Sequence, residues 1–243
     1  MKLLGDFHTH TNYTHGEGSI EDNVCQAENL GLKAIAITDH AYNSAYHMKR
    51  GDLKKMRQDI DKIKDKYQTK ILLGVETNLI SRDGQVDVSD EELNALDLVV
   101  LGYHRFTKVR CKEFFGWVLP NLLRKKKSNK QIVDNTQAYL NAMDKHRVNI
   151  LAHLNYGGCQ VDVETIAKEC VKRNIYIELN GKRINFTPVE IEKMVKTGVK
   201  FIIDSDAHRP LDVGKNHRAF NLIEKYKIPL EQVVNLNEVP EFK

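Results

Sequence analysis

The sequence lacks any apolar stretch long enough to cross a membrane. A transmembrane helix needs about 20 consecutive apolar residues, and no segment of these 243 residues approaches that length. Near the beginning of the chain, Gly5 and Asp6 interrupt the apolar run before it reaches the length of a signal-peptide core. We therefore expect a cytoplasmic protein with no membrane partner.

Cysteine is scarce, and neither sign of charge dominates. The four cysteines form no CxxC pair, the spacing typical of zinc ribbons and redox motifs, so we expect free and mostly buried thiols. The net charge of +4 attracts anionic partners only weakly and does not establish nucleic-acid binding. The apolar fraction of 41% and the charged fraction of 29% are those of a globular chain, not a disordered one. The sequence indicates no particular oligomeric state.

Short β-branched apolar segments alternate with helical segments along the chain. This alternation is typical of βα units and a parallel sheet, and a single barrel of such units commonly has about this length. The predicted strands are residues 2–5, 34–38, 71–75, 98–101, 149–152, 175–179 and 200–203. The predicted helices are residues 19–30, 52–63 with Asp52 as the cap, 89–96, 128–146, 163–173 and 188–197, with a closing helix in 211–243. The sequence predicts one α/β domain over residues 1–243.

The longest interval between predicted strands, residues 105–148, is a helical excursion that we expect to form a lid or side wall. Its segment 108–130 mixes basic and aromatic residues, as nucleic-acid binders do. Phe114, Trp117 and Val118 also have the spacing of an amphipathic helix packed on the barrel rim. If this segment is such a packed helix, its basic residues lie in solvent. They are Lys108, Arg110, Lys112 and those of 124–127. We favour the packed helix and keep nucleic acid as the less favoured partner.

Seven of the ten histidines can be placed just beyond predicted strand ends, together with carboxylates. In parallel βα barrels the loops at these ends surround one cavity. Residues two apart on an extended chain point to the same side, so both members of an HxH pair can bind one metal. The predicted ligands are His8, His10, His15, His40, Glu76, His104, His153, Asp206 and His208. This register-matched set predicts the metal centre of a hydrolase, whereas His47, His146 and His217 do not fit it.

Three aspartates, Asp6, Asp39 and Asp204, stand near these ligands in the sequence. We expect them to accept hydrogen bonds from imidazole N–H groups and so to fix the tautomers. Glu178 is a candidate internal hydrogen-bond acceptor.

Three cations are candidates for binding a phosphate. Arg183 follows the only predicted strand end that supplies no metal ligand, so a phosphate clamp is a natural use for it and for its neighbour Lys182. Arg105, next to His104, is a further candidate. For each of these cations the alternative is an ordinary surface charge.

The motifs DFHTHTNYTHG, AITDH, GVE, LGYH, LAHLNY and DSDAH follow one another along the chain. In this series the chain resembles the PHP (polymerase and histidinol phosphatase) superfamily of metal-dependent phosphoesterases, and its small stand-alone members most closely. The resemblance implies a distorted seven-stranded (βα)7 barrel that holds three divalent metal ions. It implies one ion on His8, His10, Glu76 and Asp206, a second on Glu76, His104 and His153, and a third on His15, His40 and His208. Imidazoles and carboxylates without thiolates suit Zn, Mn or Fe.

The resemblance also implies hydrolysis of a phosphate ester. Water bridging two metal ions would lose a proton and attack phosphorus, with Asp206 or His208 positioning the nucleophile or moving protons. A small phosphomonoester is the favoured substrate, and a phosphodiesterase or nuclease activity at the same site is the alternative. An amidohydrolase barrel would usually supply a bridging lysine after strand four, where this chain has LGYH. A non-catalytic metal-binding protein would have closed sites, whereas nine ligands shared by three ions leave open positions.

Overall fold

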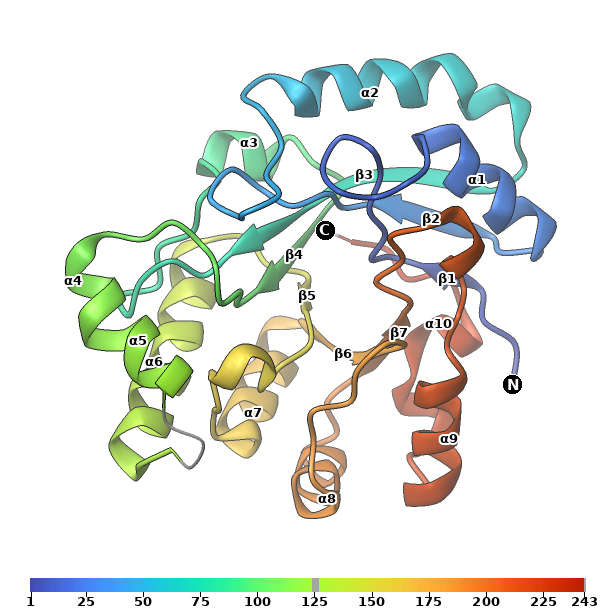
Figure 1. Ribbon diagram of the computed structural model, residues 1–243. Helices are drawn as coiled ribbons and strands as arrows, with labels where there is room; N and C mark the ends of the chain where they lie inside the picture. Colours follow the sequence, from blue (N-terminus) through green and yellow to red (C-terminus); the bar gives the residue numbers. More distant parts are fainter. Residues whose placement is uncertain (124–126, 243) are drawn as a thin grey trace.

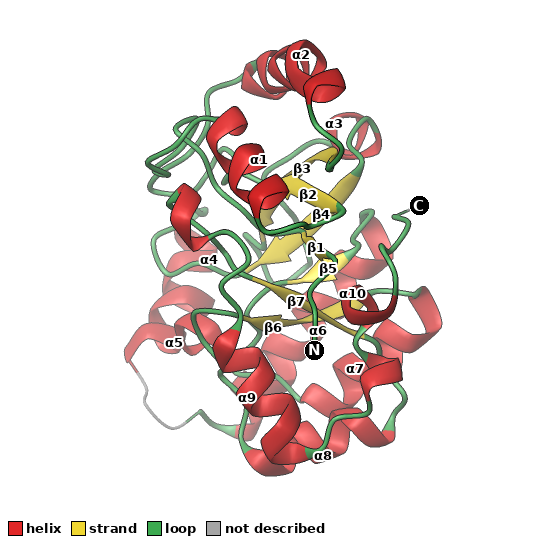
Figure 2. Cartoon of the chain, turned by 90° about the vertical axis from the view of Figure 1, so that its right-hand side faces the viewer, coloured by secondary structure: helices red, strands yellow, loops and turns green. Residues whose placement is uncertain are grey.

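The computed structural model describes residues 1–123 and 127–242, and its seven parallel strands pair in chain order. The sheet curls into a nearly closed barrel with helices around its outside, as Figures 1 and 2 show. The strands are β1 (Gly5–Asp6), β2 (Ala34–Ile37), β3 (Lys70–Asn78), β4 (Leu98–Gly102), β5 (Ile150–Leu151), β6 (Tyr176–Asn180) and β7 (Phe201–Asp204). The predicted distorted seven-stranded α/β barrel is confirmed.

Helices follow the strands and cover the sheet. Four of them, those that begin after Ser19, Ser89, Ser128 and Thr187, have capping boxes, which satisfy free N–H groups of the first turn. The α-helices are α1 (Ile20–Asn29), α2 (Asp52–Ile63), α3 (Asp90–Asn94), α4 (Cys111–Glu113), α5 (Leu119–Leu123), α6 (Asn129–Lys145), α7 (Val163–Arg173), α8 (Pro188–Lys196), α9 (His217–Tyr226) and α10 (Val234–Asn237). Within the described ranges, no helix combines the length and apolar character needed to cross a bilayer.

Helix α2 begins differently from the prediction. Its N-cap is Gly51, whose φ of +89° lies in the left-handed region that glycine tolerates. Asp52 is the first helical residue, and its carboxylate accepts hydrogen bonds from the Lys49 N–H at 2.7 Å and from Lys55 Nζ at 2.8 Å. The prediction that Asp52 is the cap is wrong, because its side chain bonds to the preceding turn and to Lys55.

Strand β3 is longer than predicted and changes its partner midway. Residues up to Leu73 pair with β2, and residues from Gly74 onward pair with β4. A Cβ on Gly74 would lie 2.8 Å from Cγ2 of Thr38 and 2.9 Å from the carbonyl oxygen of Leu98, so a larger residue would force the strands apart. The prediction that this strand ends before Glu76 is wrong. The polar residues that follow stay in the strand because Asp87 accepts hydrogen bonds from Thr77 and from Asn78.

Side chains close the barrel between β1 and β7. The Phe7 N–H donates to Oδ1 of Asp204 at 2.6 Å, and the Ser205 N–H donates to Oδ1 of Asp6 at 3.0 Å. Just beyond, the His10 N–H donates to the Ala207 carbonyl at 2.8 Å. These reciprocal bonds hold together the first and last strands.

Asn235 of α10 completes this closure lower in the barrel. Its Oδ1 accepts from the Ile203 N–H at 3.0 Å, and its Nδ2 donates to the carbonyl oxygens of Gly5 at 2.9 Å and Ile203 at 2.6 Å. The Leu4 N–H donates to the carbonyl of Asn235. The predicted strand at residues 2–5 is therefore wrong in its bounds, because helix α10 takes the place of a strand partner there.

The excursion between β4 and β5 contains α4, a π-helical turn (Phe114–Val118), α5 and α6. Trp117 and Val118 are buried as predicted, and Trp117 Nε1 donates to Asn135 Oδ1 at 2.6 Å. Phe114 is 38% exposed, so its predicted burial is wrong: the π turn presents it to solvent. Lys127 is also buried, and its Nζ donates to the carbonyl of Asn121 at 2.6 Å, contrary to the solvent-facing prediction. The remainder of the basic tract, residues 124–126, lies outside the described residues.

The cysteines are all free. Cys159 and Cys170 are buried, whereas Cys25 and Cys111 are exposed. The expectation of mostly buried thiols holds for only half of them, because Cys25 and Cys111 lie on the solvent side of their helices.

Candidate metal centre

The predicted ligands converge where the carboxyl ends of the strands meet. Three overlapping groups have donor atoms that all lie within 4.8 Å of one another. These groups are His8, His10 and Glu76; His40, Glu76 and His104; and His10, His40 and His208. His15, His153 and Asp206 contact members of these groups. The structure thus brings all nine side chains into one cluster.

One oxygen of Glu76 faces three imidazoles. Its Oε2 lies 3.5 Å from Nε2 of His8, 3.6 Å from Nε2 of His10 and 2.7 Å from Nδ1 of His40. The two Nε2 atoms of His8 and His10 are 3.2 Å apart, and Asp206 Oδ1 is 3.4 Å from Nε2 of His10. Ligand atoms bound to one metal at about 2.0–2.1 Å lie roughly 3.0–3.5 Å apart, so these atoms have the spacing of a single coordination sphere.

The other oxygen of Glu76 faces the opposite side of the cluster. Its Oε1 lies 3.2 Å from Nε2 of His104 and 2.8 Å from Nε2 of His153. Gly102, at the end of β4, leaves room for this group. A Cβ there would lie 2.9 Å from Oε1 of Glu76 and 3.0 Å from Cε1 of each histidine. Only glycine is small enough for this position, so the chain keeps a space between the donor atoms.

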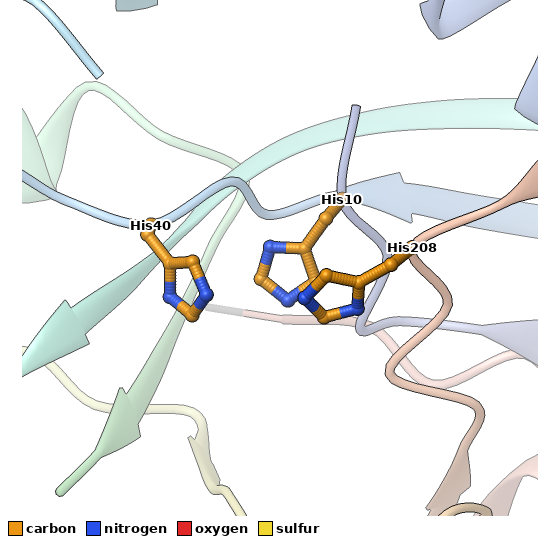
Figure 3. A group of neighbouring side chains, drawn as sticks. All are labelled: His10, His40 and His208. Atoms are coloured by element: carbon orange, nitrogen blue, oxygen red, sulfur yellow. The ribbon is translucent and has the colours of Figure 1, made fainter. Parts of the chain in front are cut away.

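A third set of imidazoles lies between β1, β2 and β7. Figure 3 shows the rings of His10, His40 and His208 turned toward a common space, each from a different strand end. His15 packs against this set, with its ring centroid 5.0 Å from that of His40 and 4.2 Å from that of His208. Tyr46 stacks on the outer side of His15 at 4.6 Å.

Lys182, in the loop after β6, places its ammonium among these ligands. Its Nζ lies 2.5 Å from Nδ1 of His208 and 3.3 Å from Oδ1 of Asp206. Asp206 therefore presents a lone pair to a positive charge, as a metal ligand does, while Nδ1 of His208 also lies 2.9 Å from the Asp206 carbonyl oxygen. Of the cations named from the sequence, it is Lys182 and not Arg183 that reaches the predicted ligands.

Several buried donor atoms have no hydrogen-bond partner among the described residues. They are Oε2 of Glu76 and Nδ1 of His10, His40 and His153. Oε2 of Glu76 and Nδ1 of His40 lie only 2.7 Å apart, yet their geometry is not that of a hydrogen bond. Leaving buried polar atoms unsatisfied costs free energy. A bound cation would satisfy those of these atoms that face the middle of the cluster, such as Oε2 of Glu76. The residues therefore fit divalent metal ions.

Burial and neighbouring charges favour the metal-binding protonation states of most ligands. Burial, with nearby His208 and Lys182, lowers the pKa of His15 to about 4, and burial lowers that of His208 to about 4. Burial alone would raise the pKa of Glu76, but His104, His40 and His8 hold it well below its usual range. Neutral imidazoles and ionised carboxylates are the forms that bind metal.

The predicted hydrogen bonds from ligand imidazoles to Asp6, Asp39 and Asp204 are wrong. Asp6 and Asp204 close the β1–β7 gap instead. Asp39 accepts from the Thr11 N–H at 2.8 Å, from the Thr11 hydroxyl at 2.6 Å and from the Thr14 hydroxyl. Each carboxylate is used to fix the backbone of a ligand-bearing loop, so it orients the ligands through the chain and not through a ring.

Glu178 and Asn78 bond to the ligand rings instead. Oε1 of Glu178 lies 2.7 Å from Nδ1 of His8, and its Oε2 accepts from the His153 N–H at 2.7 Å, as the predicted internal acceptor role requires. Oδ1 of Asn78 accepts from Nδ1 of His104 at 2.8 Å. Asn78 was not predicted, although its position two residues after Glu76 places both side chains on one face of β3.

Two predicted ligands occupy unusual backbone conformations. His153 has a φ of +31° and Asp206 a φ of +53°, both in the region that non-glycine residues rarely adopt. Such conformations persist only where the surrounding structure holds them, and they gather at functional sites. Here both side chains contact other predicted ligands, His153 with Glu76 and Asp206 with His10.

A cavity of about 390 Å³ opens above the cluster. Arg183 lines this cavity, and its guanidinium carbon lies 4.6 Å from the ring centroid of Tyr156. Arg105 lines the same cavity. The histidines that the sequence excludes from the ligand set lie outside the cluster. His47 contacts the Met48 carbonyl, and His146 pairs with Asp90 at 2.6 Å. His217 begins α9 and is not in any of the ligand groups.

Comparisons with known proteins agree with this geometry. Residues 6–182 match the model of the family described as the PHP domain. A protein of Clostridium acetobutylicum named "probable phosphatase" is 26% identical, over 98% of this chain and 92% of its own length. One of Acetivibrio thermocellus with the same name is 28% identical, over 97% and 92%. A solved structure of histidinol phosphate phosphatase from Lactococcus lactis, complexed with zinc, L-histidinol and phosphate, shares the fold with a TM-score of 0.61. That protein is 18% identical, and the match covers 93% of this chain and 94% of the length of that chain.

Proposed function

The chain belongs to the PHP domain family, and on that basis we propose that it is a metal-dependent phosphatase that hydrolyses a small phosphomonoester. One observation carries the proposal. The buried carboxylate of Glu76 lies between five imidazoles at the base of an open cavity, with each oxygen facing a different group of nitrogen atoms. A structural metal site would instead be closed.

The ligand assignment is part of the proposal. His8, His10, Glu76 and Asp206 would hold one divalent ion, Glu76, His104 and His153 a second, and His15, His40 and His208 a third, with Zn, Mn or Fe as the metal. The geometry in support is the carboxylate of Glu76, which can bridge two ions because its oxygens face different imidazoles. When bound, such ions lower the pKa of a water molecule and neutralise charge on phosphoryl oxygens.

The chain's own groups would bind the phosphate and position the water. Lys182 places its ammonium beside Asp206 and His208, where it can bind a phosphoryl oxygen. Lys182 Nζ lies 3.3 Å from Oδ1 of Asp206, and Asn180 Nδ2 donates to its Oδ2 at 3.3 Å, so both contacts would hold this carboxylate where it can position the attacking water. Arg183, on the cavity wall, provides a second cation for anionic parts of the substrate.

The shape of the site favours a monoester over a diester. The cavity has the size of a small-molecule site, and Tyr46, Phe106 and Tyr156 form part of its wall. A larger groove of about 790 Å³ is lined by basic residues, including Lys108 and Arg110. A nuclease would use a basic groove that leads into the site, and within the described residues Lys108 and Arg110 line the larger groove and not this cavity.

We also propose that residues 1–243 act as one domain in the cytoplasm. The ligand cluster draws side chains from loops after β1 and after β7, so both ends of the chain are needed for one site. Free cysteines suit a reducing compartment.

The proposal is tested by metal analysis of the purified protein together with turnover of an aryl phosphomonoester and the matching diester, with and without added Zn or Mn. We expect about three ions per chain, as the three ligand sets imply, and preferential hydrolysis of the monoester. Preferential diester hydrolysis would favour the phosphodiesterase instead. Full metal content without turnover of either ester would contradict the proposal.

A pair of histidine variants gives a matched control. His104→Gln removes a ligand nitrogen 3.2 Å from Glu76, and we expect at least about a tenfold loss of turnover. His146→Gln changes a histidine that pairs with Asp90 outside the cluster, and we expect near-normal turnover. Equal turnover of both variants would contradict the assignment of His104.

A further inference from the structure

Two arginines reach the ring of Tyr156 from different strand ends. The guanidinium carbon of Arg183, in the loop after β6, lies 4.6 Å from the ring centroid, and that of Arg105, in the loop after β4, lies 5.8 Å from it. Both distances are within the range of cation–π attraction. Among the described residues, neither arginine forms an ion pair with a carboxylate. Two like charges thus share one aromatic ring on the wall of the cavity without an anion between them.

The loops that carry these three residues bring them to one region, although both arginines are exposed. A Cβ on Gly157 would lie 3.2 Å from Cγ of Arg105, and the φ of +68° at this glycine is one that other residues rarely adopt. The stem of Arg105 therefore packs directly on the loop that carries Tyr156. The backbone of Arg183 is anchored by a hydrogen bond from its N–H to Oδ1 of Asn180 at 3.0 Å. The two guanidiniums are thus directed toward one region by the fold.

The ring of Tyr156 connects this region to the proposed metal centre. The ring of Tyr156 packs edge-on against that of His153 at 5.3 Å, and Nε2 of His153 is 2.8 Å from Glu76. Lys182 occupies the other side of the centre, beside His208. The reacting phosphate can therefore be bound by Lys182 at the centre, while the arginines face the part of the substrate that leaves.

We propose that Arg105 and Arg183 form a second anion subsite, and that the substrate is a small phosphomonoester whose alcohol portion carries another anionic group. A carboxylate or a second phosphate would suit it, because guanidinium groups bind both in bidentate fashion. Without such a group the two exposed guanidiniums face solvent with no carboxylate partner among the described residues. This inference rests on the phosphatase function proposed above.

The test compares three esters of similar length: the phosphate of 3-hydroxypropanoate, the monophosphate of propane-1,3-diol and the bisphosphate of propane-1,3-diol. We expect kcat/KM to be at least about tenfold higher for one or both of the doubly anionic esters than for the diol monophosphate, mainly through a lower KM. The carboxylate and bisphosphate arms distinguish the two kinds of anionic group. The double variant Arg105→Gln with Arg183→Gln should bring the ratio close to one.

Lys108→Gln serves as the control, because Lys108 is a nearby cation that lines the other groove. It should keep the wild-type ratio. Equal kcat/KM for all three esters in the wild type would overturn the subsite while leaving the phosphatase function intact. An unchanged ratio in the double variant would overturn the assignment to these arginines. Loss of turnover for every phosphomonoester would instead contradict the function itself.

Discussion

Glu76 is the carboxylate at the middle of the predicted ligands. It is fully buried, and five imidazoles approach its two oxygens. A buried carboxylate is stable only when neighbouring groups compensate its charge. Its replacement is therefore the most sensitive single change for the proposed centre.

Glu76→Gln preserves the shape of the side chain and removes its charge. Since two of the proposed ions share this carboxylate, we expect metal content to fall and phosphatase turnover to drop by at least about tenfold, with the fold retained. Elemental analysis, steady-state kinetics and circular dichroism check these three statements. Glu224→Gln, on the exposed side of α9, is the matched control. Near-normal turnover with full metal content would contradict the bridging role.

The sequence predicts the clustering of the proposed ligands better than it predicts their hydrogen-bond partners. Each proposed ligand lies at or near a strand end, and the pattern of strands and HxH pairs is local, so the cluster is visible without a structure. The partners of those ligands depend on which loops meet. Asp39 stands next to His40 in sequence, yet it bonds to Thr11, and Lys182 rather than Arg183 reaches His208. Loop conformation decides such contacts, and spacing along the chain does not encode it.

Helix α10 has only four residues, but it helps to close the barrel between β1 and β7. Its buried Asn235 takes part in three hydrogen bonds with β1 and β7, where the strands themselves do not pair fully. The short β1 and the long β3 were both predicted with wrong bounds. In each case a side chain from outside the strand, Asn235 or Asp87, hydrogen-bonds to the backbone of the strand, at Gly5 in β1 and at Asn78 in β3.

Asn235→Ala should destabilise the barrel. It leaves backbone groups of Gly5 and Ile203 without partners, and each unsatisfied buried group costs about 1–3 kcal/mol, so we expect a loss of roughly 2–5 kcal/mol in the free energy of unfolding. Urea denaturation measures this loss. Asn237→Ala, which removes two hydrogen bonds at an exposed position of the same helix, should cost less than about 1 kcal/mol. Equal losses in the two variants would contradict the closing role of Asn235.

For the whole molecule, bound metal should contribute to stability as well as activity. The proposed ions would bind only the folded arrangement, so at 100-fold excess over the dissociation constant a single ion adds about 2.7 kcal/mol. For a chain of this length, removal by a chelator should lower the midpoint of thermal unfolding by roughly 5–10 °C. Calorimetry before and after chelation, with metal content measured in both samples, tests this. An unchanged midpoint after verified metal loss would show that the fold does not depend on the centre.

Because β1 and β7 close the barrel, the proposed metal centre can form only after both strands have been synthesised. His8 and His10 leave the ribosome long before Asp206, His208 and Asn235 are made. A growing chain with a half-built barrel therefore exposes free imidazoles long before the carboxylate and histidine that complete the proposed coordination spheres. Loops between such distant segments are slow to close. Products that end before β7 would thus carry part of the proposed metal-binding residues without the complete centre, and maturation of the site must follow synthesis of β7 and α10.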